Sequence, residues 1–426
     1  MDNRISALAS FLDSAVSTYH AVDTLKNTLS EAGYTQLCEA SPWDLVPGGK
    51  YFITRNGTSL MAFRIPADTA KGFLMSASHS DRPGFKVKEN PELKSAYIRL
   101  AVERYGGMLM APWLDRPLSV AGRVLVETEN GVETKLVNFD RDLLIIPNVA
   151  IHMNRQANEG YKWNPASDML PLLGTKDKAG KFAAMLEEAA GGKVLGHDLS
   201  LYVRQQACVW GLEDEFISSA ALDDLSAAWC CTQGFLNAAE GTHVPVLCVF
   251  DNEEVGSSSL QGADSDLLST LLARICQSMN WSLPQMLAQS FMLSADNAHA
   301  MHPNHPEFSD PNNAPVVNGG VVLKFNANQR YTTDGVSAAC FRKICAKAGV
   351  PVQTYCNRAD MMGGSTLGNI SLHHVSVPSA DIGLPQLAMH SCYETAGTKD
   401  AIFMMDALAA FYSVNLSGCN GNYTIE

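Results

Sequence analysis

From about residue 215 onward, helical patterns alternate with short apolar runs. The helical pattern DLSAAWCCTQGFLNAAE at 224–240 is followed by the apolar run VPVLCVF at 244–250, and later runs are GVVLKF at 320–325 and HVSVPS at 374–379. Continuous apolar runs are typical of strands that are buried on both faces of a parallel sheet. The alternation therefore predicts an α/β fold with a mostly parallel sheet covered by helices.

The first part of the chain fits the same layer, but the middle part does not. An amphipathic helix with Ile5, Leu8, Phe11 and Leu12 on one face is expected at the start, and short strands are expected within residues 51–80. Between 92 and 212 the apolar and polar positions alternate, and a hairpin turn is expected at 129–131. We therefore expect a catalytic α/β domain, formed by 1–91 and 213–426, with an inserted β-rich domain at 92–212.

Charge and composition exclude several classes of function. The formal net charge of −13 repels nucleic acid and anionic membrane surfaces, and no apolar run approaches the roughly 20 residues that a bilayer requires. The start lacks the pattern of a secretory signal. The eleven cysteines form no CxxC pairs, so we expect reduced and mostly buried thiols in a cytoplasmic protein. P-loop, GxGxxG and GxSxG patterns are absent, which disfavours nucleotide binding and serine-hydrolase chemistry.

The apolar run at 244–250 ends in an unusual crowd of carboxylates. Asp251, Asn252, Glu253 and Glu254 follow it directly, with no Lys or Arg nearby. Like charges this close repel, and one group should protonate unless an outside cation holds them ionised. Glu253 and Glu254 can both reach one pocket only if the strand has ended and the chain turns, which Gly256 permits. One Glu could then bind a metal while the other stays free as a base.

Two further motifs could supply metal ligands. His79 and Asp81 are two residues apart at the end of an apolar run, so on a strand both point the same way and the carboxylate can orient the imidazole. Asp223 and Asp224 precede a helical pattern, where either could simply cap the helix. Two together leave a carboxylate that could bridge two cations.

Later segments offer the remaining candidates. In SADNAHAMHPNHPE, Asp296 is the expected ligand, whereas His299, His302 and His305 are not expected to bind metal, because the prolines within the segment prevent one continuous helix. His390 in QLAMHSCYE is a second candidate, with the pair at 373–374 as its rival. Two histidines and at least three carboxylates suit zinc, or manganese or cobalt, and a bridging carboxylate suits two metals roughly 3.5 to 4 Å apart.

At this point the sequence resembles the aspartyl aminopeptidase family of dinuclear-zinc metallopeptidases. The resemblance extends over nearly the whole chain and rests on ordered motifs: YHAV at 19–22, PGGKYFITRN at 47–56, HSDRPGFKVK at 79–88, LDRPLSVAGRV at 114–124, IPNVAIHMNR at 146–155, LDDL at 222–225, DNEEVGS at 251–257, SADNAHAMHPNH at 294–305, KFNANQRY at 324–331 and QLAMHS at 386–391.

The resemblance implies roles for particular residues. It implies that Asp223 bridges two zinc ions and that Glu253 is the general base. Asp81 would support a ligand, and His152 would reach the active site of a neighbouring subunit and bind substrate there. The implied metal ligands are His79, Asp223, Glu254, Asp296 and His390.

The resemblance also implies an architecture and a substrate class. The fold would be a phosphorylase/hydrolase-like zinc-peptidase domain with an inserted dimerisation domain, assembled from dimers into a tetrahedral dodecamer. The substrates would be short peptides with a free N-terminus, and His299 and Asn328 would help to bind them. Relatives have a Lys near Asn328 that holds an acidic side chain, and a neutral amide cannot replace that charge. Asn369 also stands where relatives usually have Pro.

Two alternatives stay open at the level of sequence. The first is a dinuclear-metal deacylase or carboxypeptidase on the same scaffold. The second is a self-assembling scaffold protein whose metals are only structural. The uncoordinated carboxylate expected beside the metals argues against the second alternative, because a structural site has no use for it.

Overall fold

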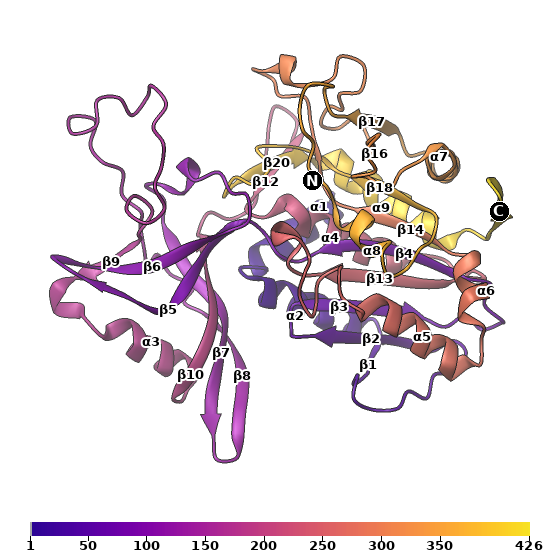
Figure 1. Ribbon diagram of the computed structural model, residues 1–426, viewed down its shortest axis with the longest axis horizontal. Helices are drawn as coiled ribbons and strands as arrows, with labels where there is room; N and C mark the ends of the chain where they lie inside the picture. The colour runs from indigo at the N-terminus through magenta and orange to yellow at the C-terminus, as the bar shows by residue number, and fades with distance from the viewer. Residues whose placement is uncertain (1) are drawn as a thin grey trace.

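A nine-stranded sheet forms the centre of the molecule, and a six-stranded sheet projects from one side of it (Figure 1). The structure, a computed structural model, describes residues 2–426, apart from the side chain of Cys419. None of the helices within 2–426 is both long enough and apolar enough to cross a membrane.

The central sheet is mixed, with a parallel middle, an antiparallel strand β3 between β2 and β13 on one side, and a strand β16 that runs antiparallel to β18 on the other. Strands β13, β4, β14 and β18 are neighbours and run parallel, so their carboxyl ends meet at one edge of the sheet. This confirms the predicted α/β class. The strands, in their order across the sheet, are β1 (Thr35–Gln36), β2 (Lys50–Arg55), β3 (Ser59–Arg64), β13 (Val244–Phe250), β4 (Phe73–His79), β14 (Phe291–Ala295), β18 (Ser379–Gly383), β16 (Val321–Phe325) and β17 (Val352–Cys356).

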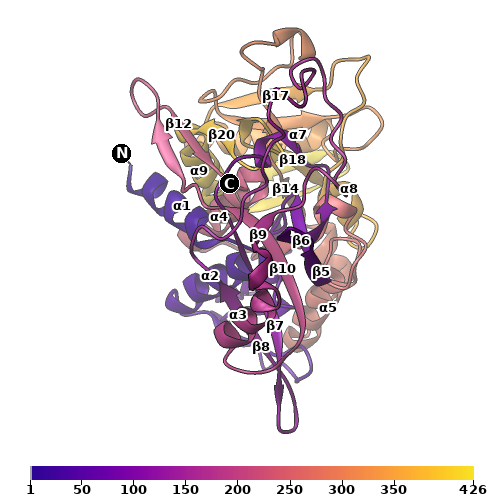
Figure 2. The same cartoon turned by 90° about the vertical axis from the view of Figure 1, so that its left-hand side faces the viewer.

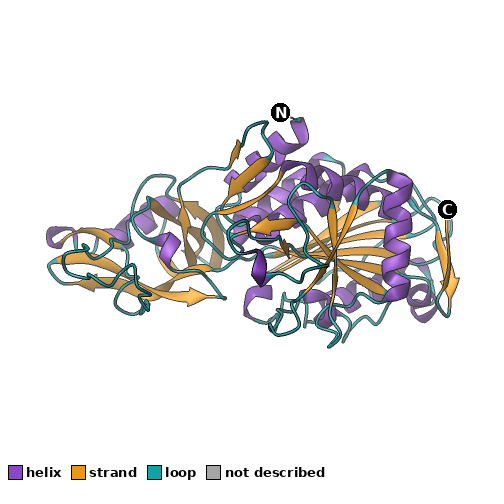
Figure 3. Ribbon diagram, turned by 90° about the horizontal axis from the view of Figure 1, so that it is seen from above, coloured by secondary structure: helices purple, strands orange, loops and turns teal. Residues whose placement is uncertain are grey.

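Helices cover both faces of this sheet (Figure 3). Along β13, Leu247 and Val249 pack into one apolar core while Val246 and Cys248 pack into the other, because successive side chains of a strand point to opposite faces. The first core contains α1 (Asn3–Ser14), α2 (Thr18–Glu31), α4 (Leu222–Asn237), α7 (Gly335–Ala348) and α9 (Thr398–Ser413), and the second contains α5 (Leu267–Met279), α6 (Leu283–Ala288) and α8 (Leu367–Ser371). The four apolar residues predicted for the first helix are buried.

The six-stranded sheet is antiparallel and has an apolar core of its own, which includes Phe85, Leu100, Val120 and Leu199 (Figure 2). Its first strand begins at Gly84, ahead of the division at 92 that the sequence analysis made, because β5 follows β4 after a short turn. The division into domains remains a proposal. The elements are β8 (Gly131–Asn138), β7 (Leu118–Thr128), β10 (Val194–Val203), β5 (Gly84–Lys94), β6 (Tyr97–Tyr105) and β9 (Leu172–Thr175), with α3 (Lys181–Ala190) against them.

Smaller sheets and short helices complete the fold. A five-stranded sheet contains β11 (Cys208–Trp210), β12 (Phe216–Ser219), β20 (Glu394–Gly397), β19 (Pro385–Leu387) and β15 (Ala298–His299). A two-stranded sheet near the C-terminus pairs β21 (Leu416–Cys419) with β22 (Asn422–Ile425). Short 3-10 helices are η1 (Ala111–Trp113), η2 (Lys176–Lys178), η3 (Glu253–Val255) and η4 (Pro306–Phe308).

One predicted strand is placed differently by the structure. The apolar run at 374–379 was expected to be a strand, but β18 begins only at Ser379. His374 and Val375 instead donate backbone hydrogen bonds to Ser371 in the turn after α8, and Pro378 has no N–H to give to a neighbouring strand. The run therefore leads into the buried strand rather than forming it.

Candidate metal centre

The candidate ligands meet at the carboxyl edge of the central sheet. His79 is the last residue of β4, and η3 with Glu254 follows β13 directly. Asp296 follows β14, which lies on the other side of β4. Asp223 stands at the start of α4, and His390 lies in the loop after β19. This is the edge at which open α/β sheets usually carry their sites.

Ligand atoms of these residues form overlapping groups in which all atoms lie within 4.8 Å of one another. Asp223 belongs to two of the groups and faces a histidine on each side. Its Oδ1 lies 3.7 Å from Nε2 of His79, and its Oδ2 lies 3.4 Å from Nε2 of His390. The same Nε2 of His390 lies 3.4 Å from Oε2 of Glu254. The groups are His79, Asp223, Asp224 and Asp296; His79, Glu253 and Glu254; and Asp223, Glu254 and His390.

Several oxygens at this centre are buried without a hydrogen-bond partner among the described residues. They are Oδ1 of Asp223, Oδ1 of Asp224 and Oε1 of Glu254. A buried carboxylate oxygen without a donor is costly, because it has lost its water and gained nothing in return. A cation at this position would satisfy these oxygens, so the residues present fit one or more metal ions.

Asp81 organises the turn that carries Glu253 and Glu254. Its Oδ1 accepts the backbone N–H of Glu253 at 3.1 Å, and its Oδ2 accepts that of Glu254 at 3.1 Å and the hydroxyl of Tyr105 at 2.6 Å. Oδ1 also lies 3.2 Å from Nδ1 of His79. Burial opposes the ionisation of Asp81, but its contacts with His79 and Tyr105 hold its pKa below the usual range. As a carboxylate it directs Nε2 of His79 toward Asp223.

The pair at 223–224 does not cap α4. The capping position is Ala221, which has no side chain able to do so, and both aspartates have non-helical backbone angles. The side chain of Asp224 accepts a hydrogen bond from the backbone N–H of His79 at 3.1 Å. The backbone N–H of Asp223 donates a hydrogen bond to the side chain of Glu394 at 3.0 Å. Both side chains are thus available to the cluster, and the capping alternative from the sequence is wrong.

Asp296 lies beside a buried lysine. The ammonium of Lys324, which is 2% exposed, donates to the backbone carbonyl of Asp296 at 2.7 Å and lies 3.6 Å from its Oδ2. It also donates to the carbonyl of Asn297 at 3.3 Å. Burial raises the pKa of Asp296, whereas Lys324 lowers it and so favours the charged form. Lys324 was not among the residues predicted from the sequence, although it begins the motif KFNANQRY.

The pKa values show how strongly the charges at this centre depend on one another. Burial lowers the pKa of His390, but Asp223 outweighs burial and raises it to about 9. Burial also raises the pKa of Glu253 to about 8 and that of Glu254 well above its usual range, where Asp223 adds to the effect. Groups with displaced pKa values in a cleft are typical of functional sites.

The cluster lines a cavity of about 130 Å³. The residues that line it include all five candidate ligands and Glu253, together with Lys324, Tyr331 and Tyr355. His299 and Met389 line this cavity and also a neighbouring one of about 300 Å³.

Some predicted residues do not reach the cavity within the subunit. Asn328 lies in the exposed turn after β16, where its backbone N–H is bound to Asn326, and His152 is exposed between β8 and β9. Neither of them is among the residues that line either cavity, nor is the rival pair at 373–374, of which His374 contacts Asp264.

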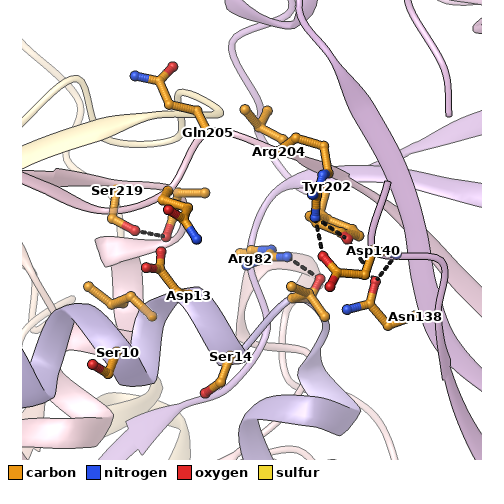
Figure 4. Close-up of a pocket in the computed structure, with 15 residues that line it drawn as sticks. Ser10, Asp13, Ser14, Arg82, Asn138, Asp140, Tyr202, Arg204, Gln205 and Ser219 are labelled. Atoms are coloured by element: carbon orange, nitrogen blue, oxygen red, sulfur yellow. Dashed lines mark hydrogen bonds and ion pairs between the residues drawn. The ribbon is translucent and has the colours of Figure 1, made fainter. Parts of the chain in front are cut away.

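A larger cavity, of about 500 Å³, lies elsewhere, between α1 and the six-stranded sheet (Figure 4). In the figure the guanidinium of Arg82 lies between Asp13 and Asp140. Arg82 donates to the backbone carbonyls of Ala15 and Val16 at the end of α1. No histidine is among the described residues that line this cavity, and its two carboxylates lie on either side of Arg82, so it does not resemble a metal site.

Comparison with known proteins agrees with this geometry. The pattern of the family described as "Aminopeptidase I zinc metalloprotease (M18)" matches residues 11–412. A relative from Clostridium acetobutylicum described as "Probable M18 family aminopeptidase 2" is 42% identical over 423 residues, which cover 96% of this chain and 98% of the relative. A relative of the same description from Pseudomonas putida is 41% identical over 419 residues, 96% of this chain and 97% of its own.

Solved structures show the same fold. One, described as "Cryo-EM structure of the Ape4 and Nbr1 complex", has a TM-score of 0.93 and 34% identity, and the match covers 96% of this chain and 85% of the other. Another, the mApe1 dodecamer of S. cerevisiae, has a TM-score of 0.85 and 26% identity, with 96% and 95% covered. On the strength of the family pattern and these relatives, the chain belongs to the M18 family of zinc metallo-aminopeptidases.

Proposed function

We propose that this aminopeptidase uses two zinc ions, bridged by Asp223, to remove the N-terminal residue of short peptides. The observation that carries the proposal is the position of Asp223, whose two carboxylate oxygens face His79 on one side and His390 on the other. A carboxylate with one oxygen directed toward each of two histidines suits a pair of cations better than a single cation. His79 and Asp296 would complete one site, and His390 and Glu254 the other. Manganese or cobalt would suit the same ligands.

The metals, when bound, supply the positive charge that polarises the scissile carbonyl and makes water more acidic. The protein's own residues hold those charges in place. Nδ1 of His79 faces Asp81 and Nδ1 of His390 donates to the carbonyl of Gly107 at 3.0 Å, which leaves Nε2 of each ring free as a ligand. Lys324 limits the negative charge around Asp296.

Glu253 is the proposed general base. It lines the cavity next to Glu254, and its carboxylate has no hydrogen-bond or ion-pair partner among residues 2–426. It can therefore take a proton from the attacking water and pass it to the leaving amine. Its pKa of about 8 in the metal-free protein falls when cations are near, because positive charge favours the carboxylate.

The assembly is also part of the proposal. A structural relative is described as a dodecamer, and we propose that this chain forms a tetrahedral dodecamer built from dimers. The six-stranded sheet would mediate dimerisation, beside a phosphorylase/hydrolase-like catalytic domain. His152 is exposed on the long segment between β8 and β9, which suits a residue that reaches a neighbouring subunit. Oligomerisation around a chamber would admit only short unfolded peptides.

The cavity wall bears on which first residue of a peptide is preferred. Lys324 is the one lysine among the described residues that line the cavity, and it donates hydrogen bonds to the carbonyls of Asp296 and Asn297. Asn328 offers only a neutral amide. Acidic residues are therefore compared with apolar ones in the test, and His299, on the cavity wall, is the proposed contact for the substrate. A cytoplasmic location is proposed because the ten cysteines with described side chains are free.

The test is hydrolysis of aminoacyl reporter substrates with Asp, Glu, Leu or Ala as the first residue. The full-length protein is used, and the number of metal ions bound per subunit is measured on the same sample. Chelator should abolish hydrolysis, and zinc, manganese or cobalt should restore it. Activity only on acetylated amino acids would favour a deacylase, and cleavage from the C-terminus a carboxypeptidase. An intact oligomer that binds zinc but cleaves no substrate would make the chain a scaffold.

A further inference from the structure

A buried acid, Glu394, holds two of the candidate ligands by their backbone. Glu394 is the first residue of β20 and is 1% exposed. Its Oε2 accepts the backbone N–H of Asp223 at 3.0 Å, and its Oε1 accepts the backbone N–H of His390 at 2.7 Å. One carboxyl group therefore joins the start of α4 to the loop after β19.

Both amide groups lie where regular structure offers them no acceptor. His390 has a left-handed backbone (φ 67°), which is unfavourable for a residue with a Cβ, and Asp223 has non-helical angles (φ −85°, ψ 109°). A buried N–H without an acceptor would cost free energy of its own. Glu394 supplies the acceptor for both, and it thereby keeps both residues in these conformations.

The side chains of the same two residues face each other at the centre. Nε2 of His390 lies 3.4 Å from Asp223 and 3.4 Å from Glu254, and the carbonyl of Gly107 fixes the orientation of the imidazole ring. Gly107 thus determines how the ring is turned, whereas Glu394 determines where the backbone of His390 stands relative to Asp223. A shift of either residue would change the space between the ligand atoms directly.

We propose that Glu394 is a positioning residue that sets the separation of Asp223 and His390, and with it the affinity of the zinc site formed with Glu254. The inference rests on the proposed two-zinc function. Its chemistry requires a carboxylate, because both oxygens must accept. Glutamine would turn an NH₂ group toward one of the two N–H donors, and aspartate is one methylene too short to keep both contacts.

The chain contains a matched control for this arrangement. Asp400 in α9 is also buried, and its two oxygens also accept two backbone N–H groups, those of Asn318 and Gly320. Asp400 does not line the metal cavity and contacts none of the candidate ligands. Asp400→Asn therefore disturbs the same kind of contact in another part of the fold.

The experiment titrates full-length Glu394→Gln, Glu394→Asp and Asp400→Asn with zinc against a chromophoric chelator, beside the wild type. The wild type should bind two zinc ions. In both Glu394 variants the affinity for one of the two zinc ions should fall about 10- to 100-fold, which is the usual effect of losing a residue that supports a metal ligand. The affinity for the other zinc ion should stay at the wild-type value. Asp400→Asn should bind both zinc ions with wild-type affinity, whatever its melting temperature.

Two results would overturn the inference. Wild-type affinity for both ions in Glu394→Gln would show that the carboxylate does not set the site, and an equal loss in Asp400→Asn would show a general effect of destabilisation. If Glu394→Gln does not fold, Glu394→Asp decides alone, and if neither folds while Asp400→Asn does, the role is structural and the inference fails. A wild type that binds fewer than two zinc ions would refute the proposed two-zinc function itself.

Discussion

Tyr105 donates a hydrogen bond of 2.6 Å to the Asp81 carboxylate, and this contact ties the six-stranded sheet to the metal centre. Tyr105 ends β6, and its hydroxyl also accepts a hydrogen bond from the side-chain amide of Asn252 at 2.8 Å. Asp81 in turn binds the backbone of Glu253 and Glu254. A residue of the projecting sheet therefore helps to place the proposed base and a proposed ligand.

Tyr105→Phe should weaken the centre without unfolding the chain. The substitution removes one of the donors to a buried carboxylate and leaves the amide of Asn252 without its acceptor, while the ring still fills its space. We expect zinc affinity or kcat/KM to fall about 10- to 100-fold, which is usual for the loss of such a supporting contact. Zinc titration and steady-state kinetics on a reporter peptide measure the two quantities.

Tyr97→Phe is the matched control, because Tyr97 begins the same strand but is 55% exposed. It should leave both zinc affinity and kcat/KM unchanged. Wild-type zinc affinity and kinetics in Tyr105→Phe would show that His79 and the backbone donors hold Asp81 well enough without the tyrosine.

Glu253→Gln and Glu254→Gln should separate the two neighbouring carboxylates by role. Gln at 253 keeps the size of the side chain but cannot take a proton, so kcat should fall by about 10² to 10⁴ with both zinc ions retained. Gln at 254 replaces a charged ligand with a neutral one, so the zinc ion held with His390 should be lost first. Metal analysis of the purified variants, together with kcat, distinguishes the two effects.

The reverse pattern would contradict the assignment. Near-normal turnover in Glu253→Gln would eliminate it as the base, and full zinc content in Glu254→Gln would eliminate that residue as a ligand.

The metal cluster could be predicted because its residues stand where the pattern of the chain changes. Phe250 ends a continuous apolar strand and Glu253 follows within a turn, so sequence alone indicates carboxylates at the edge of a sheet. The alternation between Leu247 and Cys248 on opposite faces likewise follows from the period of a strand. Residue type and position along the chain were therefore sufficient to predict the carboxylates of the metal cluster.

The supporting contacts could not be predicted, since they depend on how distant segments approach each other. Glu394 follows His390 by four positions in a quoted motif, but nothing local shows that its carboxylate also reaches Asp223. Lys324 looks like an exposed polar residue at the end of a strand, yet it is buried against Asp296. The role of His152 rests on the resemblance alone, because it requires a second subunit.

Zinc binding should release protons at pH 7 and become tighter as the pH rises toward 9. In the metal-free protein His390 has a pKa of about 9 and Glu253 of about 8, so these two groups hold protons at pH 7, and burial raises the pKa of Glu254 as well. A ligand must lose its proton before it binds zinc. Calorimetric titration in two buffers of different ionisation enthalpy, with zinc buffered by a chelator, measures the number released.

His390→Gln serves as the control for this experiment, because it removes one of the protons that zinc must displace. The variant should release fewer protons at pH 7 and show a shallower dependence of zinc affinity on pH. An affinity of the wild type that is constant between pH 7 and 9 would contradict the proposed ligand set.

Stability toward acid should depend on His243, at the opposite end of β13 from the metal centre. Burial lowers the pKa of His243 to about 4, although the carbonyl of Gln289, 3.2 Å from its Nε2, opposes the shift. In the unfolded chain the same imidazole takes up its proton near pH 6.5. Between these two pH values the unfolded state binds more protons than the folded state. The contribution of His243 to the stability of the folded state is therefore fully present above pH 6.5 and is lost as the pH falls to about 4. The loss amounts to about 3 kcal/mol of unfolding free energy.

His243→Gln should remove this part of the acid sensitivity, whereas His373→Gln, at an exposed position, should retain it. Urea unfolding at pH 7 and pH 4.5, with chelator present throughout so that zinc release does not contribute, measures the difference between the variants. An equal loss of stability in wild type and His243→Gln would show that other groups account for acid unfolding.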